Sequence, residues 1–358
     1  MHAFRRYSLI LFLLMFLLRT ISAQTNMHDT TKVLQLFEQG NRFIDGPTDS
    51  LMFYYQKALV IIRGNLNKNP KGTNDDALYQ KFRLLEQRVY IEFGIEYFYR
   101  SDYAKALENY FAALAIAEET GDPDGLSECY SEIGIVYKNQ GRLSEALNYY
   151  EKALAMAQKG SDSSWVASCM INIGNIYKEK NLLITSLNYY FDALKIFERL
   201  GHSRRIAACY QSIGDVYSQQ QDFNKALEYF DKSLILSIES KDRVMETVCY
   251  LSIGSVNAKR KDFESARKYY IKALKIYEIT GYRHEMDDCY ILIGDSWLAQ
   301  ENYNEAILNY EKALEISQQE KDMAAPWITC SSQSIQQIYS RLLKKQMKAS
   351  QMMKWPAS

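Results

Sequence analysis

The chain is poor in proline, has no surplus of basic residues and shows no spacing typical of a catalytic or metal centre. Only 5 of its 358 residues are proline, while 47% are hydrophobic and 13% aromatic. This composition excludes a disordered chain and favours a helical, well-packed one. The 43 basic and 43 acidic residues balance, and three arginines lie within the first 23 residues, so the remainder is mildly acidic. A nucleic-acid partner would require a basic surface, so we exclude it.

Groups that could perform chemistry are equally scarce. The four histidines are far apart in the sequence, at His2, His28, His202 and His284. No glycine-rich phosphate loop and no close cysteine or histidine pair is present. A hydrolase or transferase needs a nucleophile with a base, a metal cluster or paired acids in a pocket. The sequence therefore predicts that the protein is not an enzyme and needs no metal or cofactor.

The first 23 residues have the pattern of a secretory signal peptide. Arg5 and Arg6 precede an apolar run from Leu9 to Leu18, and Ala23 ends a small-residue exit. We expect cleavage near Ala23 and a periplasmic, soluble mature chain. The alternative is an uncleaved N-terminal membrane anchor, although the apolar run is about half as long as a bilayer span.

A 40-residue repeat is the most informative feature of the sequence. A glycine in a helix interior costs roughly 1 kcal/mol relative to alanine, so glycines in register indicate a repeated close helix contact. Six of them stand at this interval inside apolar helical stretches: Gly94, Gly134, Gly174, Gly214, Gly254 and Gly294. These are the expected structural glycines of six successive helix hairpins.

Other positions follow the same register. Twelve residues after each glycine stands a small residue, which we expect to face that glycine across the hairpin: Ala106, Ala146, Ser186, Ala226, Ala266 and Ala306. Sixteen residues after it stands an aromatic one: Tyr110, Tyr150, Tyr190, Phe230, Tyr270 and Tyr310. Short polar residues just before the second helices are expected to cap them: Asp102, Asp222, Asp262 and Asn302.

Five of the six cysteines also share one register, at Cys129, Cys169, Cys209, Cys249 and Cys289. Equivalent positions of stacked repeats lie on the order of 10 Å apart, which is too far for a disulfide. We expect free, buried thiols that fill space. Metal binding or redox chemistry is the alternative.

The repeat pattern divides the chain into five segments. These are a signal peptide (1–23), a degenerate first repeat (24–63), a polar linker (64–76), six 40-residue repeats (77–319), and a closing helix with a tail (320–358). The tail carries lysines among methionines and Trp355. It is either a solvated end or a surface that touches a membrane or partner.

This register resembles the tetratricopeptide repeat family, closely over residues 77–319 and loosely over 30–62. The family's period is about 34 residues, with a proline ending the second helix. Here the period is 40 and Gln158 stands near the expected proline, so we expect longer helices. The resemblance implies an all-α fold, a right-handed superhelical solenoid of antiparallel helix hairpins. Tyrosine-rich long repeats after a signal peptide also resemble the extracytoplasmic part of Bacteroidetes-type sensor proteins.

The resemblance further implies that the first helices line a concave groove. Its geometry assigns partner contacts to the position after each glycine and those three or four beyond: Lys138, Asn139, Asn175, Lys178, Asp215, Gln219, Ser255, Lys259 and Asp295. Ile91, Ile95 and Tyr99 make the amino-terminal end apolar. The family's clamp for a terminal carboxylate needs lysine three residues before the glycine, where Ser131 and Gln211 stand instead. The alternative is that these polar residues are merely solvated and the partner binds elsewhere.

The function predicted is that of an exported scaffold which binds a protein or peptide in this groove. The second hypothesis is a sensory module of a two-component-type signalling protein, either as a free-standing relative or truncated from a longer form. Both rest on analogy with the family rather than on a recognised site.

Overall fold

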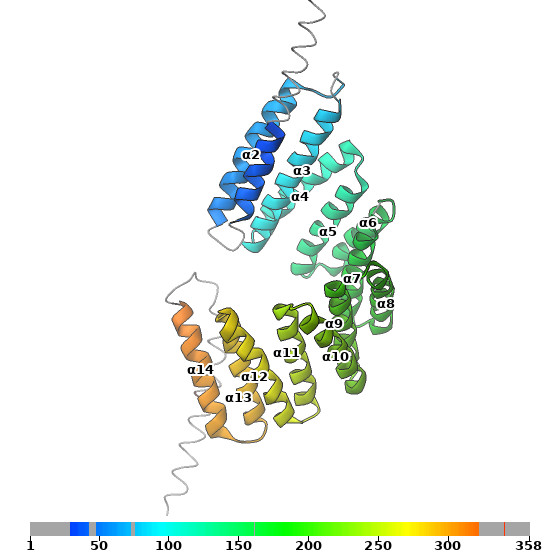
Figure 1. The fold of residues 1–358 in the computed structure, drawn as a ribbon. Helices are drawn as coiled ribbons and strands as arrows, with labels where there is room; N and C mark the ends of the chain where they lie inside the picture. Colours follow the sequence, from blue (N-terminus) through cyan, green and yellow to red (C-terminus); the bar gives the residue numbers. More distant parts are fainter. Residues whose placement is uncertain (1–28, 43–47, 73–75, 161, 322–339, 341–358) are drawn as a thin grey trace, which may run out of the picture. The chain divides into compact units, whose positions relative to one another are not determined.

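The computed structural model describes residues 29–42, 48–72, 76–160, 162–321 and 340, and all regular structure in them is helical. A helix over residues 29–41 comes first. The others, labelled in Figure 1, are α2 (Thr48–Lys68), α3 (Asp76–Tyr99), α4 (Tyr103–Thr120), α5 (Pro123–Asn139), α6 (Leu143–Ala157), α7 (Ser163–Glu179), α8 (Leu183–Leu200), α9 (Ser203–Gln219), α10 (Phe223–Glu239), α11 (Arg243–Lys259), α12 (Phe263–Thr280), α13 (His284–Leu298) and α14 (Tyr303–Lys321). None of the helices in the described residues combines the length and apolarity needed to cross a bilayer. The predicted signal peptide and closing helix lie outside the described residues, apart from Ser340.

The chain forms two compact units, residues 1–176 and 177–358. Within the first unit α2, α3, α4, α5 and α6 pack against one another in chain order. In the second unit α8 to α14 do the same, and the first helices α9 and α11 of successive repeats also touch directly. Short turns join antiparallel neighbours, as Figure 1 shows for each unit. The expected all-α solenoid of helix hairpins is confirmed.

The repeat glycines mark the closest helix approach, as predicted, but they face a different residue from the one expected. The nearest atoms to a Cβ built on Gly214 belong to the ring of Phe230, at 2.5 Å from Cε1. Gly134 meets the ring of Tyr150 at 2.7 Å, and Tyr150 is 1% exposed. The expectation that the small residue twelve positions on would face the glycine was wrong. The aromatic ring sixteen positions on fills that space, because it lies one helical turn further along the second helix.

Polar residues before the second helices act as N-caps, as expected. Asp222 Oδ1 accepts a hydrogen bond from the backbone N–H of Lys225 at 3.2 Å. The same bond is formed at the three other predicted caps, Asp102, Asp262 and Asn302. Arg142 and Leu182 hold this position in two repeats and form no capping bond.

The predicted polar linker starts later than expected, because α2 continues to Lys68. Asn65 lies inside this helix, is 2% exposed and donates from its side chain to the Ile61 carbonyl. Leu66 packs on the apolar core of the first unit. The predicted loop at 64–68 was therefore wrong. The helix continues through this polar stretch because Asn65 is buried and Leu66 packs on the core.

The cysteines behave as the register predicted. All five in the repeat register are free and buried. Cys169 Sγ lies 3.6 Å from Ser127 Oγ and 3.7 Å from Ser131 Oγ, at the contact between neighbouring repeats. They fill space between helices, and Cys330 lies outside the described residues.

Candidate functional site

A hollow of about 430 Å³ opens on the first helices of the first unit. Helices α3 and α5 form most of its wall, the turn before α5 contributes Asp122, and α7 contributes Trp165. Its lining thus comes from three consecutive repeats. Such a surface exists only when the repeats stack. We call it the acidic hollow.

Four carboxylates line the acidic hollow, on Glu92, Asp122, Asp124 and Glu128. Its one lining cation is Arg88, which is half exposed and whose Nε lies 3.9 Å from a carboxylate oxygen of Glu92. Negative charge therefore exceeds positive charge around it. Like charges held close together in a partly dehydrated place repel strongly.

The pKa values of two of these acids are raised. Burial raises the pKa of Glu92 above its ordinary value, although Arg88 opposes the rise. Burial also raises the pKa of Glu128, and the nearby negative charge of Glu92 adds to the rise. The ionised form of these carboxylates is thus less stable here than in water, and a positive charge in the hollow would stabilise it.

A fifth acid, Glu132, lies one turn further along α5. Burial raises its pKa to about 7, with Glu128 and Glu92 adding to the rise and a hydrogen bond from Tyr110 opposing it. The Tyr110 hydroxyl donates to Glu132 Oε2 at 3.2 Å. Since Tyr110 also fills the contact with Gly94, the acidic face is tied to the repeat core.

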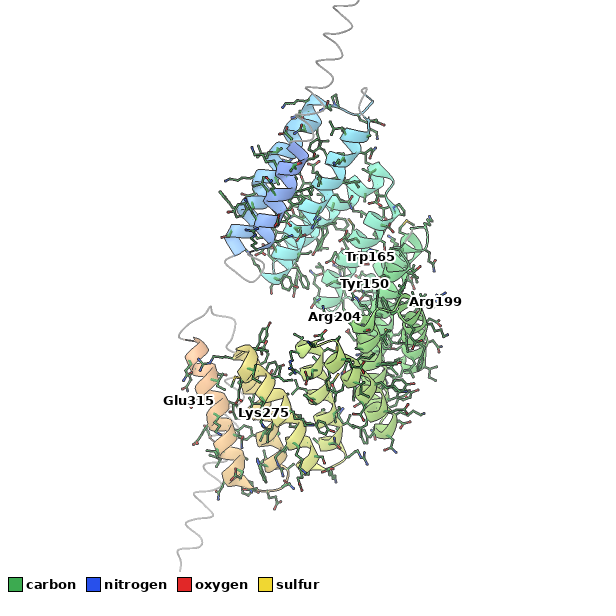
Figure 2. All side chains as sticks on the ribbon, in the orientation of Figure 1. Tyr150, Trp165, Arg199, Arg204, Lys275 and Glu315 are labelled. Atoms are coloured by element: carbon green, nitrogen blue, oxygen red, sulfur yellow. The ribbon has the colours of Figure 1, made fainter. Side chains whose placement is uncertain are left out.

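The other walls of the acidic hollow are apolar. Leu84, Ile91 and Ile95 come from one face of α3, and Trp165, labelled in Figure 2, comes from the start of α7. Leu84 is 43% exposed, so apolar surface is open to a partner. The predicted apolar amino-terminal end therefore holds for Ile91 and Ile95, while Tyr99 is 78% exposed and does not line the hollow.

Of the polar groove residues predicted from the family, the structure joins one pair directly. Lys178 Nζ lies 3.5 Å from Asp215 Oδ2. The Gln211 amide donates to Asp215 Oδ1 at 3.3 Å within α9 and to Ser252 Oγ on α11 at 2.7 Å, which links two successive repeats. Burial raises the pKa of Asp215, and Lys178 opposes the rise.

Three of the four remaining predicted residues of the second unit, Gln219, Lys259 and Asp295, form contacts with residues that the prediction did not include. The Gln219 amide donates to Asn181 Oδ1 at 3.2 Å, and Lys259 Nζ lies 3.1 Å from Ser218 Oγ. Asp295 accepts a hydrogen bond from Tyr310. Ser255 is half buried. Several of these groups are thus engaged within the protein.

In the first unit the predicted polar residues do not line the acidic hollow. The Asn139 side chain donates to the Ile135 carbonyl at 2.9 Å, which closes the end of its own helix. Lys138 and Asn175 are half buried. The hollow lies nearer the beginning of the first helices than these residues do.

The prediction from sequence missed the acids and Gln87. It used only positions after each glycine, whereas the acids stand two and six residues before it, at Glu92, Glu132 and Glu128. Positions two and six residues before the glycine lie on one helical face with the position after it. Counting charge at these positions would have found Glu92, Glu128 and Glu132, but not Asp122 and Asp124, which stand in and just after the turn before α5.

No group of three or more histidine, cysteine, aspartate or glutamate side chains among the described residues is arranged to hold a metal ion. A second, smaller hollow of about 240 Å³ is mainly apolar and is lined by residues of α11, α12 and the start of α13. It contains the single pair of charged residues Arg243 and Glu285. Of these two hollows the acidic hollow is the larger and combines apolar walls with several charged groups, so we take it as the candidate site.

Comparison with known proteins agrees with this architecture. The apo form of RapI has a TM-score of 0.60 and 17% identity, covering 81% of this chain and 99% of that one. The apo quorum sensor NprR from B. thuringiensis gives 0.55 and 16%, with 84% and 79% covered. Aspartyl phosphate phosphatase F from Bacillus subtilis gives 0.55 and 15%, with 90% and 85% covered. At these identities the likeness concerns the fold alone.

The family relationship rests on the sequence. No curated protein gives a significant match. The tetratricopeptide repeat model matches residues 88–159, 165–236 and 246–319, which together make up more than half of the chain. The chain belongs to the tetratricopeptide repeat family.

Proposed function

We propose that this chain is a non-enzymatic scaffold that binds a protein or peptide partner on the face of its first helices. The observation that carries the proposal is the acidic hollow, to which three consecutive repeats contribute apolar and charged walls. Grooves lined by a few convergent polar groups and exposed apolar side chains suit an extended or helical peptide. The excess of acid there argues against nucleic acid as the partner.

The neighbouring structures are consistent with this role. One of them is described as a Rap protein complexed with a competence and sporulation factor, at 15% identity and a TM-score of 0.50. Another is described as a quorum sensor. The sensory function is therefore the second candidate, in which the same hollow would take a signalling ligand.

Peptide retention tests the binding proposal. Immobilised full-length protein is incubated with a random nonapeptide mixture, and the retained peptides are eluted and sequenced. We expect Leu84→Arg to lower retention at least fivefold, because it places a long charged side chain at an exposed apolar wall of the hollow. Val60→Arg is the matched control, since Val60 is 73% exposed and does not line the hollow. Equal retention by both variants, or none by the wild type, would contradict the proposal.

We also propose that the protein is exported to the periplasm, on the basis of the first 23 residues. Expression in a Gram-negative host, followed by fractionation and amino-terminal sequencing, tests this. We expect the periplasmic chain to begin at Gln24. A membrane-bound chain that keeps Met1 would instead indicate the uncleaved anchor.

A further inference from the structure

Two residues that line the acidic hollow each carry a buried oxygen that has no hydrogen-bond partner among the described residues. Gln87 on α3 lines the hollow and is only 4% exposed. Within the described part of the chain, its Oε1 forms no hydrogen bond, and its Nε2 reaches only Cys129 Sγ, at 4.0 Å. Asp124, which also lines the hollow, has a buried Oδ1 without a partner among the described residues, and this atom lies beside Gly160. A buried acceptor without a donor destabilises the protein, so this arrangement requires a donor.

The surroundings of these oxygens specify a positively charged donor. Glu92, Asp122 and Glu128 share the lining of the hollow with Gln87 and Asp124, and the cation in that lining, Arg88, is already beside Glu92. Acceptors and carboxylates crowded together favour an ammonium or guanidinium group, which offers several N–H donors and no acceptor. A neutral donor would satisfy the hydrogen bonds but leave the charge repulsion.

The space around Gln87 is kept open by a glycine. A Cβ on Gly125 would lie 2.6 Å from Asp122 Oδ2 and closer still to the amide nitrogen of Gln87. Any larger residue at this position would force both groups to move. Gly125 thus allows the amide and the carboxylate to approach one another at the floor of the hollow.

The apolar walls suit the stem of a long basic side chain. Leu84 and Ile95 can cover methylene groups, and the indole of Trp165 offers an aromatic face on which a cation can rest. A hollow of about 430 Å³ has room for such a side chain with the adjoining backbone. Lysine and arginine combine these two properties, an apolar stem and a charged end.

We propose that the acidic hollow binds a lysine or arginine side chain of a peptide partner, with its charged end at Gln87, Asp124 and Glu128. The inference rests on the proposed function and specifies the partner's chemistry. Arginine suits the site particularly well, because its planar donor fork can serve the Gln87 oxygen and a carboxylate at the same time. Acidic and purely apolar peptides are excluded from this position.

The test uses nonapeptide mixtures in which one position is fixed in turn as arginine, lysine, citrulline, leucine or glutamate. Citrulline keeps the shape of arginine and removes its charge. We expect the full-length protein to retain the arginine or lysine mixture at least tenfold better than the citrulline mixture. Glu128→Gln and Gln87→Leu should each reduce this preference at least threefold. Glu228→Gln is the control, since Glu228 is an exposed acid on α10 that pairs with Lys232, and it should leave the preference unchanged.

The outcomes separate the two proposals. Retention without any preference for a basic residue would overturn the basic-side-chain inference and leave peptide binding intact. Retention of no peptide at all would overturn both. Titration with CaCl2 alone gives the third arm: a calcium affinity that Glu128→Gln abolishes, together with loss of basic-peptide retention in calcium, would make the hollow a cation site and overturn the inference.

Discussion

Gly214 on α9 and Phe230 on α10 lie so close that a methyl group on the glycine would stand 2.5 Å from the ring. Phe230 is 1% exposed, so its ring has no free space into which to turn. The same contact, with tyrosine in place of phenylalanine, recurs at Gly94, Gly134, Gly254 and Gly294. The repeat glycine is therefore a packing requirement of each hairpin.

We predict that Gly214→Ala lowers the free energy of unfolding by about 2 kcal/mol, and Gly214→Leu by more, through overpacking. Gly294→Ala is the matched control, because its methyl would lie 3.0 Å from the Tyr310 ring and alanine favours the helix. It should be close to neutral. Urea unfolding of the three variants measures this, and equal stability of Gly214→Leu and wild type would refute the close contact.

The capping position offers a stabilising change. Leu182 has φ −91° and ψ 65°, near the values of −80° and 72° at the capping Asp222, and it is 49% exposed. We predict that Leu182→Asp raises the free energy of unfolding by about 1 kcal/mol, because its carboxylate can accept a backbone N–H of the first turn. Asp222→Ala should lower stability by a similar amount. Thermal unfolding checks both, and a destabilised Leu182→Asp would contradict the argument.

Glu132 should make stability depend on pH. Its pKa is raised to about 7 in the folded chain, against 4.5 when unperturbed. The folded state therefore holds a proton that the unfolded state has lost between these values, so this group's contribution to stability falls as pH rises from about 4.5 to 7. We predict that Glu132→Gln is more stable than wild type by on the order of 2 kcal/mol at pH 8.

The gain from Glu132→Gln should fall as the pH is lowered through 7 and level off only below pH 4.5, where the wild-type residue becomes protonated in the unfolded state as well. Urea unfolding of both proteins between pH 4.5 and 8 measures the difference, and Glu228→Gln serves as an exposed control. A difference that does not change with pH would show that Glu132 ionises normally. The charges facing Glu132 are those of Glu128 and Glu92, with the Tyr110 hydroxyl bonded to it.

The thiols give a further prediction. Burial raises the pKa of Cys209 and of Cys289 to about 12, so the native chain should react slowly with a thiol reagent at pH 8. After unfolding without reductant, all six cysteines should titrate as free thiols. Recovery of fewer than about four would show that disulfides form and that the spacing argument fails.

Much of the fold was predictable because the 40-residue register repeats the same packing problem six times. Its glycines, aromatic residues and caps predicted helix hairpins, and each confirmed contact lies within one hairpin or between neighbours. The partner of the glycine was not predictable from size alone. From size alone we expected Ala226 to face Gly214, because both are small. The geometry of the hairpin instead brings Phe230 nearest to Gly214.

The candidate site was only partly predictable. Ile91 and Ile95 were expected on the apolar end and do line the hollow. The acids and Gln87 were missed, since they precede the glycine in the register, and Trp165 arrives from a repeat about 70 residues further along the chain. The residues on α3, α5 and α7 become neighbours only when the helices stack, so the sequence alone did not show that they form one site.

By itself the sequence determined the class of this protein, an array of helix hairpins in which buried cysteines and tyrosines recur every 40 residues. A periodic pattern specifies local packing, and local packing is all that a repeat array needs. Which charged groups lie beside an opposite charge depends on how the helices stack, and the sequence did not show it. Lys178 lies beside Asp215, whereas burial raises the pKa of Glu128 although Arg88 opposes the rise, and burial raises the pKa of Glu132 with Glu128 and Glu92 adding to it. Dehydration depends on which neighbours displace water from a group, and those neighbours come from different repeats.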